Sequence, residues 1–277
     1  MEITVSPAKA IGLLCKTPHP IWLGFLQKFE QYAIYIIIDD NQSDYTIKYQ
    51  QQYPVMHFIQ LRDEECLANG FSNLNKIVLN KEVTAWDKAS YYFSCIETCY
   101  QHIWLVEEDV FIYNEKVLLN IDQKFPDSDL LTAPFEIGTE ANISNYWYWP
   151  KINIPFPPPY YCALVCCARI SNTLLQHIKE YAVNNKQLFF LEAFFPTMAM
   201  HHHLTYHIPK DMTTVLYRFK WDYDTLNKGN TFHPVKNISF HKKARNKLQT
   251  MIQPPIKYIF PNFITRIVKR WVRLVSG

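Results

Sequence analysis

Short apolar runs alternate with amphipathic stretches along most of the chain. The runs at 10–15, 33–38 and 55–61 have the length and the β-branched content of buried strands, and residues 21–29 have helical periodicity. Further strands are predicted at 103–106, 128–132, 162–168 and 187–191, and helices at 171–183, capped by Ser171, and from Glu192. This alternation predicts an α/β fold with a mostly parallel sheet flanked by helices.

A second helix-start signal lies before the strand at 103–106. Thr84-Ala85-Trp86-Asp87 has the pattern of a capping box, in which a Thr hydroxyl and a carboxylate three residues later satisfy free backbone N–H groups. The residues that follow place their apolar side chains on one helical face: Ala89, Tyr92, Phe93, Ile96, Cys99 and Tyr100.

The strand at 103–106 ends in three consecutive acids, Glu107, Glu108 and Asp109, before the chain turns apolar again. A buried strand therefore delivers carboxylates to its C-terminal edge, which is where open α/β sheets bind ligands. Clustered carboxylates repel one another unless a cation neutralises them, and Mg²⁺ and Mn²⁺ prefer oxygen ligands. The pattern indicates a metal site, and a hydrated acidic turn is the alternative.

The composition fits one large core. The chain has 277 residues, of which 48% are hydrophobic and 16% aromatic, so we expect one domain with a C-terminal appendage. No apolar run approaches the ~18 residues of a membrane span, and the start has no basic leader or apolar signal core, so a cytoplasmic protein is expected. The seven cysteines form no CxxC pair, which favours buried free thiols over structural zinc.

The glycines exclude several nucleotide-binding motifs. There are six, and no two are spaced to form GxGxxG or a Walker loop. A bound phosphate would therefore depend on a metal and on basic side chains. This argues against a dinucleotide oxidoreductase and a P-loop NTPase.

Charge is distributed unevenly. Residues 242–277 contain nine Lys and Arg and no acid, which leaves 19 basic against 25 acidic residues in 1–241. A mildly acidic body lacks the broad positive face that nucleic acids require, so no nucleic-acid partner is expected.

Two other polar points fall at or near strand ends. Asp39 and Asp40 follow the run at 33–38, where a carboxylate could accept hydrogen bonds from a ribose or a base, or simply form an Asx turn. Late in the chain, His233 and Lys236 are three residues apart, a pair suited to completing a metal shell and contacting a diphosphate.

The order of these features resembles the GT-A glycosyltransferases over roughly residues 8–240. The likeness rests on Asp39-Asp40, the Trp86-Asp87-Lys88-Ala89 helix start, residues 104–111, Glu192-Ala193-Phe194-Phe195 and His233-Pro234-Val235-Lys236. It implies a GT-A domain over 1–241, with a donor half at about 8–112 and an acceptor half at about 113–241, and a basic extension at 242–277. The size and the expected location suggest the glycan-building enzymes of bacteria or of large algal viruses (chloroviruses), xylosyltransferases among them.

The resemblance also implies a cofactor, a donor and an acceptor. The acidic strand end is similar to the DxD-type motif that chelates Mn²⁺ or Mg²⁺, although it reads Glu-Glu-Asp, so the division of roles between Glu107 and Glu108 stays open. The implied metal ligands are Glu107, Asp109 and His233. The implied donor is a UDP-sugar, with UDP-xylose as one candidate, and the implied acceptor is a glycan. The residues implied to contact the donor are Asp39, Asp40, Asp87, Lys88, Glu107, Glu108 and Lys236.

An inverting transfer also needs a carboxylate that takes the proton of the acceptor hydroxyl. Glu192 lies between apolar runs, where partial burial would raise its pKa, so it is the predicted base. Glu136 and Glu140 are the reserve candidates. A retaining enzyme would not need this base, and Glu192 could simply favour a helix N-terminus.

Aromatic residues and prolines gather in the predicted loop at 146–161. Trp147 and Trp149 are predicted to stack on an acceptor glycan, and closing the core is the alternative role of this loop. His201-His202-His203 resembles a metal cluster, but successive helical residues point about 100° apart, so it is predicted to be a polar helix end.

Three other classes of protein are compatible with parts of the pattern. A nucleotidyltransferase would use similar carboxylates but normally adds a Gly-rich or basic triphosphate loop. A metal-dependent hydrolase would carry more His and Asp ligands at strand ends. A non-catalytic sugar-binding module would keep the aromatic residues without a metal site.

The C-terminal segment 260–277 has the pattern of a basic amphipathic helix. The apolar positions are Ile264, Ile267, Val268, Trp271, Leu274 and Val275, opposite four Lys and Arg residues. Such a helix can lie at a membrane surface with its cations toward anionic lipid, and this would make the protein a peripheral membrane protein. Docking on the domain is the alternative.

Overall fold

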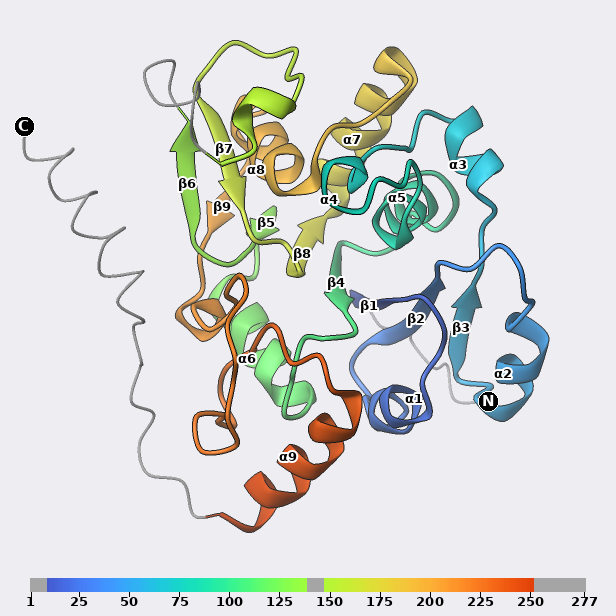
Figure 1. Ribbon diagram of the computed structural model, residues 1–277, viewed down its shortest axis with the longest axis vertical. Helices are drawn as coiled ribbons and strands as arrows, with labels where there is room; N and C mark the ends of the chain where they lie inside the picture. The colour runs from blue at the N-terminus through green and yellow to red at the C-terminus, as the bar shows by residue number, and fades with distance from the viewer. Residues whose placement is uncertain (1–8, 139–146, 252–277) are drawn as a thin grey trace, which may run out of the picture.

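The computed structural model describes residues 9–138 and 147–251 (Figure 1). Its centre is a seven-stranded sheet in the order β3-β2-β1-β4-β8-β5-β9, and β6 and β7 form a separate two-stranded sheet. The central strands are β1 (Lys9–Cys15), β2 (Ala33–Ile38), β3 (Met56–Ile59), β4 (His102–Glu107), β5 (Leu130–Leu131), β8 (Cys167–Ser171) and β9 (Tyr206–His207). The fold is therefore α/β, as predicted.

The half of the sheet from β3 to β4 is parallel. The strands β1, β2 and β4 are buried on both faces, which explains why they appear in the sequence as continuous apolar runs. The carboxyl ends of β1, β2 and β4 meet at one edge, where Cys15 lies beside Ile38 and Leu14 beside Glu107. Residues that follow these strands are thus brought together.

The other half begins with an antiparallel pair, β4 and β8. The predicted single strand at 162–168 is wrong, because the chain leaves one sheet and joins another within it. Residues up to Ala163 belong to β7 (Tyr160–Ala163), which pairs with β6 (Phe135–Gly138), whereas β8 starts at Cys167 in the central sheet. Residues 164–166 connect the two sheets and border the site described below.

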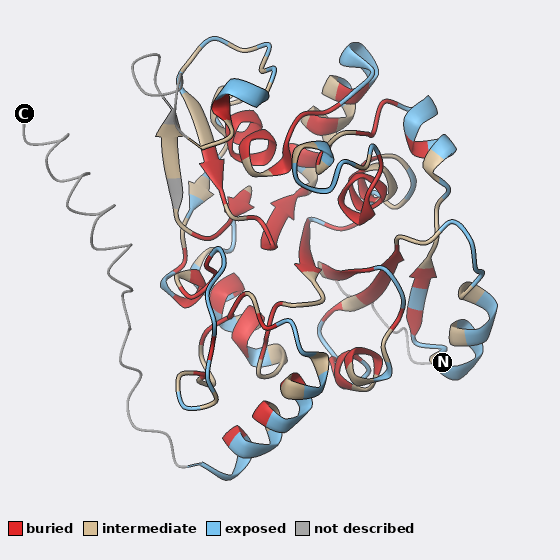
Figure 2. Ribbon diagram, in the orientation of Figure 1, coloured by how far each residue is buried: buried red, intermediate tan, exposed pale blue. Residues whose placement is uncertain are grey.

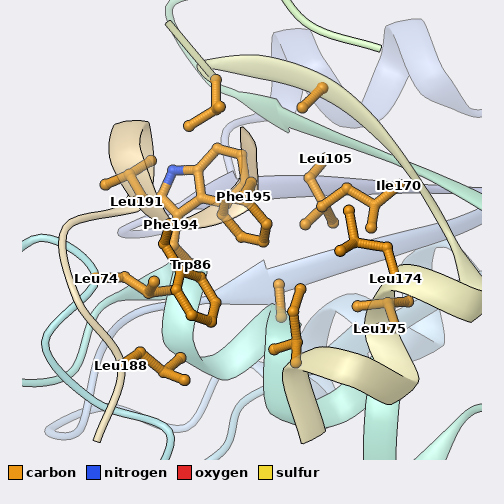
Figure 3. Packing of buried hydrophobic residues seen from close by; sticks show 14 of the residues in the cluster. Leu74, Trp86, Leu105, Ile170, Leu174, Leu175, Leu188, Leu191, Phe194 and Phe195 are labelled. Atoms are coloured by element: carbon orange, nitrogen blue, oxygen red, sulfur yellow. The ribbon is translucent and has the colours of Figure 1, made fainter. Parts of the chain in front are cut away.

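Helices cover both faces of the central sheet (Figure 1). On one face α5 (Ala85–Tyr91), its π-helical continuation η1 (Tyr92–Ile96), α7 (Asn172–Asn185) and α8 (Leu191–His201) form a core with the side chains of alternate strand residues. Figure 3 shows this packing, with Trp86, Leu174 and Phe195 around Leu105 and Ile170. The predicted capping box is present at Thr84 and Asp87, and Ser171 caps α7 as predicted.

The opposite face is covered by α1 (Pro20–Leu26) and α6 (Glu115–Lys124), with α9 (Ile238–Thr250) beyond them. A fully buried ion pair links this layer to the sheet, because Asp122 of α6 accepts from Arg169 of β8 at 2.8 Å. Asp122 also accepts from Tyr32, Trp104 and Lys9. Four donors thus satisfy one carboxylate within the core.

Shorter elements complete the fold. Figure 2 shows that α2, α3 and the outer side of α9 are exposed, while the central strands and the inner sides of α5 and α8 are buried. Residues 187–191 are not a strand as predicted, because they extend between α7 and α8 without pairing to another strand. The remaining elements are α2 (Thr46–Gln52), α3 (Asp63–Ala68), α4 (Lys76–Leu79), η2 (Trp149–Lys151) and η3 (Lys210–Met212).

The predicted boundary between 241 and 242 falls inside α9, which is packed on the domain. Arg245 donates to the carbonyl of Ile112 at 2.9 Å and lies over the rings of Trp22 and Phe25. The predicted amphipathic helix at 260–277 lies outside the described residues. Among the helices that are described, none is long and apolar enough to cross a membrane.

Candidate active site

The acidic segment after β4 is held by its backbone. Glu107 N–H donates to the carbonyl of Cys166 at 2.9 Å, and Val110 N–H donates back to the carbonyl of Glu107 at 3.0 Å, which forms a turn. The Glu107 side chain accepts from the Trp86 indole at 2.7 Å. The backbone carbonyl of Glu108 accepts from the Trp22 indole at 2.8 Å. Two buried tryptophans therefore fix the end of the strand in place.

His233 is brought to this turn by a distant segment. Phe232 pairs with Phe111 in an isolated bridge, and Val235 N–H donates to the carbonyl of Asp109 at 2.6 Å. As a result His233 Nε2 lies 3.4 Å from Asp109 Oδ1. The other ring nitrogen, Nδ1, is 2.9 Å from the carbonyl oxygen of Leu216. Because a carbonyl can only accept, Nδ1 carries a hydrogen, and in the neutral ring Nε2 presents a lone pair.

Cys166 completes this group and was not expected from the sequence. One ligand atom each of Glu107, Cys166 and His233 lies within 4.8 Å of the other two. The thiol lies there because β4 and β8 are antiparallel with Val106 opposite Cys167, so the next pair along the same ladder is Glu107 and Cys166. A pairing between strands some 60 residues apart leaves no local signal in the sequence.

Burial and neighbouring carboxylates shift the pKa values of Glu107, Glu108 and His233. Burial raises the pKa of Glu107, and the neighbouring Asp109 raises it further. The pKa of Glu108 is raised by burial and by both neighbouring carboxylates. Burial alone would lower the pKa of His233, but Asp109 and Glu107 outweigh it and the net direction is upward. Burial thus disfavours the charged forms of both glutamates, and the neighbouring negative charges add repulsion that a cation would relieve.

These residues fit a divalent cation. Asp109 Oδ1 is buried and has no hydrogen-bond partner in the described part of the chain. Together with the lone pair of a neutral His233 and the carboxylate of Glu107, it forms a set of oxygen and nitrogen donors that Mn²⁺ and related ions accept. The predicted metal ligands are thus brought together.

A cleft of about 650 Å³ opens beside this group. Residues from the ends of β1, β2 and β4, the start of α5 and the start of α8 line it, together with the loops that carry Tyr148, Tyr217 and His233. Of the predicted site residues, the lining includes Asp39, Glu107, Glu108, Asp109, Glu192, His233 and Lys236. It does not include Asp40, Asp87, Lys88, Trp147 or Trp149.

Glu192 faces the cleft from the first turn of α8. Burial raises its pKa to about 8, and the charge of Glu107 adds to this effect. A carboxyl group with such a pKa can exchange a proton near neutral pH. The reserve candidates are not placed in this way, since Glu136 lies on β6 away from the cleft lining and Glu140 lies outside the described residues.

Asp39 is held by two lysines at the end of β2. Lys81 and Lys88 lie 2.6 and 3.1 Å from Asp39 Oδ1. Lys88 is fully buried and also contacts Asp63 at 2.9 Å and Asn41 at 3.3 Å, so it supports Asp39 from behind and does not reach into the cleft. Both lysine contacts use the same oxygen of Asp39.

Asp87 and Asp40 have structural hydrogen bonds. The fully buried carboxylate of Asp87 accepts from Leu74 N–H at 3.1 Å and from Thr84 N–H and hydroxyl at 2.8 Å. Asp40 accepts from Gln42 N–H at 2.8 Å, which is the Asx turn that the sequence left open. Direct donor contacts by Asp40, Asp87 and Lys88 therefore have no support in this geometry.

Three cationic side chains line the cleft: Lys16, Arg218 and Lys236. All three are exposed, and none of them forms an ion pair within the described part of the chain. Only Lys236 was predicted. Lys16 could have been found from its position one residue after β1, whereas the loop that carries Arg218 has no pattern in the sequence. Arg218 has a φ of 51°, in the left-handed region that non-glycine residues rarely adopt.

The aromatic loop contributes a tyrosine to the cleft. Trp149 is buried and Trp147 packs between Trp149 and Phe190, so both close the core under the loop. Tyr148 lies between them in sequence and lines the cleft, where its hydroxyl is hydrogen-bonded to Tyr217. The three histidines 201–203 lie at the C-terminal end of α8, as predicted.

No protein-family model and no curated protein matches the chain in sequence. Solved structures with a similar arrangement of elements exist. One is 4-diphosphocytidyl-2C-methyl-D-erythritol synthase from Anaerococcus prevotii, with 8% identity and a TM-score of 0.46, covering 87% of this chain and 95% of that one. Mouse xyloside xylosyltransferase 1 has 14% identity and a TM-score of 0.37, covering 73% and 85%. The galactosyltransferase LgtC, in complex with donor and acceptor sugar analogs, has 10% identity and a TM-score of 0.45, covering 88% and 98%.

Two of these three structures are glycosyltransferases, the class that the motifs resemble. None of the three supports the expected similarity to an algal-virus enzyme. At this level of similarity the comparison describes the arrangement of elements only. Any function has to be argued from the residues of the cleft.

Proposed function

We propose that this protein is a metal-dependent glycosyltransferase that moves a sugar from a nucleotide-sugar donor to a glycan acceptor. The observation that carries the proposal is that His233 lies beside both Glu107 and Asp109, in a cleft that also holds exposed cationic side chains and the partly buried Glu192. A diphosphate leaving group and an acceptor hydroxyl need these kinds of residue.

A divalent cation, Mn²⁺ or Mg²⁺, would be held by Glu107, Asp109 and His233. When bound it would supply positive charge to the departing nucleoside diphosphate. Lys236 and Lys16 line the same cleft and would contact the phosphate oxygens directly. Because the chain lacks a glycine-rich phosphate loop, these side chains would replace backbone N–H groups in that role.

The donor nucleoside would lie at the ends of β1 and β2. Asp39 lines this part of the cleft, and Lys81 and Lys88 hold one of its oxygens. The other oxygen, Oδ2, would accept hydrogen bonds from a ribose or a base. We propose a UDP-sugar as donor, with UDP-xylose as the first sugar to test.

Glu192 would be the base of an inverting transfer. The acceptor oxygen forms its bond to the anomeric carbon while its proton passes to Glu192, and the bond from the anomeric carbon to the phosphate oxygen breaks. Tyr148 and Tyr217 would form the acceptor side of the cleft, next to Glu192, in place of the predicted Trp147 and Trp149.

The test is a thermal-shift and hydrolysis screen of UDP- and GDP-sugars with and without Mn²⁺. A bound donor at 100 times its Kd stabilises the native state by about 2.7 kcal/mol, which raises the melting temperature measurably. We expect one nucleotide-sugar to stabilise the protein only with Mn²⁺ and to be hydrolysed slowly. The control variant is Asp40→Asn, because Asp40 follows Asp39 but does not line the cleft. It should be stabilised by the same nucleotide-sugar as the wild-type protein.

Other outcomes identify other functions. Stabilisation by a nucleoside triphosphate with release of pyrophosphate would replace the proposal with a nucleotidyltransferase. Stabilisation by a free glycan without any effect of Mn²⁺ or of a nucleotide would replace it with a sugar-binding module.

A further inference from the structure

Cys166 differs from the other buried cysteines in what its thiol contacts. Its sulfur lies within 4.8 Å of the ligand atoms of Glu107 and His233. Cys167, the next residue, is the first residue of β8, where it is fully buried and pairs with Val106 of β4. Cys15 also lines the cleft, but its thiol lies 3.8 Å from the carbonyl of Ile37 and outside the metal-binding group.

The position of Cys166 is fixed by the backbone. The carbonyl of Cys166 accepts from Glu107 N–H, and the two residues continue the β4–β8 register. Residues directly opposite each other in an antiparallel ladder point to the same face, with Cβ atoms ~5 Å apart. The Cβ atom of Cys166 is therefore held on the same side of the sheet as that of Glu107.

We propose that Cys166 is a ligand of the cation, and that its sulfur makes this centre favour Zn²⁺, Co²⁺ or Cd²⁺ over Mg²⁺. Carboxylate oxygens and water suit Mg²⁺, whereas a thiolate is a soft ligand that Mg²⁺ does not favour. An imidazole, a thiolate and a carboxylate together are a ligand set found with borderline cations. The inference deepens the proposed function, on which it rests for the existence of a cation site.

The binding step is balanced without a redox partner. The S–H bond of Cys166 would break as the metal–sulfur bond forms, and the thiol proton would leave to solvent. Metal ligation removes a thiol proton in this way because the thiolate is the ligand.

Cadmium provides a direct test without a donor sugar. A cadmium–thiolate bond gives a near-ultraviolet charge-transfer band, so the protein is titrated with Cd²⁺ while this band is recorded. The starting protein carries Cys99→Ser, since Cys99 is an exposed thiol that could bind metal independently. Cys15→Ser is the matched control, because Cys15 lines the same cleft but is not part of the group.

We expect the band to saturate at one equivalent of Cd²⁺ in the starting protein and in Cys15→Ser, and to be absent in Cys166→Ser. Loss of the sulfur should weaken Cd²⁺ binding at least ~10-fold and change Mg²⁺ binding less than about twofold, measured by competition with Mn²⁺. Cys166→Ala provides a second variant if the serine variant is misfolded by circular dichroism.

Two results would overturn the inference: a band that persists in Cys166→Ser, or Mn²⁺ binding to the starting protein with no cadmium band. In the second case the proposed glycosyltransferase still stands. Conversely, a cadmium band in a protein that no nucleotide-sugar stabilises keeps the thiolate centre and rejects the proposed reaction.

Discussion

The acidic residues after β4 have different surroundings although they are adjacent. Glu107 ends β4 and belongs to the group with Cys166 and His233, whereas Asp109 lies in the turn that follows and contacts His233. Burial raises the pKa of the Cys15 thiol, and Glu108 lies close enough to Cys15 to raise it further. This difference favours Glu107 over Glu108 as the first metal ligand.

Asp109→Asn tests this assignment. The change removes a ligand charge from the cation, so we expect kcat/KM to fall at least ~100-fold and the effect of Mn²⁺ on donor binding to be lost. The melting temperature without metal should stay the same or rise, because Asp109 is a source of repulsion for Glu107 and Glu108. Normal activity in this variant with Mn²⁺ present would reject Asp109 as a ligand.

Glu192 is tested through the pH dependence of turnover. A base must be ionised to accept a proton, and burial and Glu107 hold the pKa of Glu192 at about 8. We therefore expect kcat to rise as pH increases through about 8 and to level off only above that pKa. Glu192→Gln should keep donor affinity, lose this pH dependence and lower kcat by roughly 10²- to 10⁴-fold. A flat profile in the wild-type protein would exclude this base.

At the scale of elements, the correct predictions were the strands and helix caps that depend on local sequence patterns. The strands β1, β2 and β4, the capping box at Thr84 and the cap at Ser171 follow from apolar periodicity and local hydrogen bonds. The prediction failed at 162–168 and 187–191, because an apolar run looks the same whether it pairs in one sheet, crosses between two sheets or packs as a loop. The acidic residues at the end of β4 were predictable, but the position of Cys166 depended on that unpredicted crossing.

The contact between α6 and β8 has a measurable energy. Asp122 and Arg169 are both fully buried, so Asp122→Asn leaves an unpaired guanidinium in the core. We expect the free energy of unfolding to fall by ~3–5 kcal/mol in urea denaturation. Asp224→Asn is the control and should change stability very little, because its pair with Lys247 is exposed. Equal stability of the two variants would contradict the structural role of Asp122.

At the scale of the whole molecule, one buried imidazole couples stability to pH. His241 of α9 packs between Trp22 and Phe111, and burial lowers its pKa from 6.5 to about 4. The unfolded chain therefore binds a proton between pH 6.5 and 4 while the native protein does not. The free energy of unfolding should thus decrease as pH falls through this range, by ~3 kcal/mol in total from this group.

The variant His241→Gln separates the contribution of His241 to the pH dependence of stability from the contribution of the acidic residues. The amide of glutamine can donate to the carbonyl of Val235, as His241 does at 2.7 Å, but it does not titrate. We expect urea denaturation curves to show a weaker loss of stability between pH 6.5 and 4 in the variant. An identical pH dependence in both proteins would show that His241 is not the coupled group.

The candidate metal ligands come from segments that are far apart in the chain, at Glu107, Cys166 and His233. The first two meet only when β8 has paired with β4, and the third arrives only when the segment at 232–235 has joined Phe111 and Asp109. A partly folded chain therefore has no complete site. Cation uptake would occur only after folding is finished, so it could be used as a measure of how much newly made protein has reached its native state.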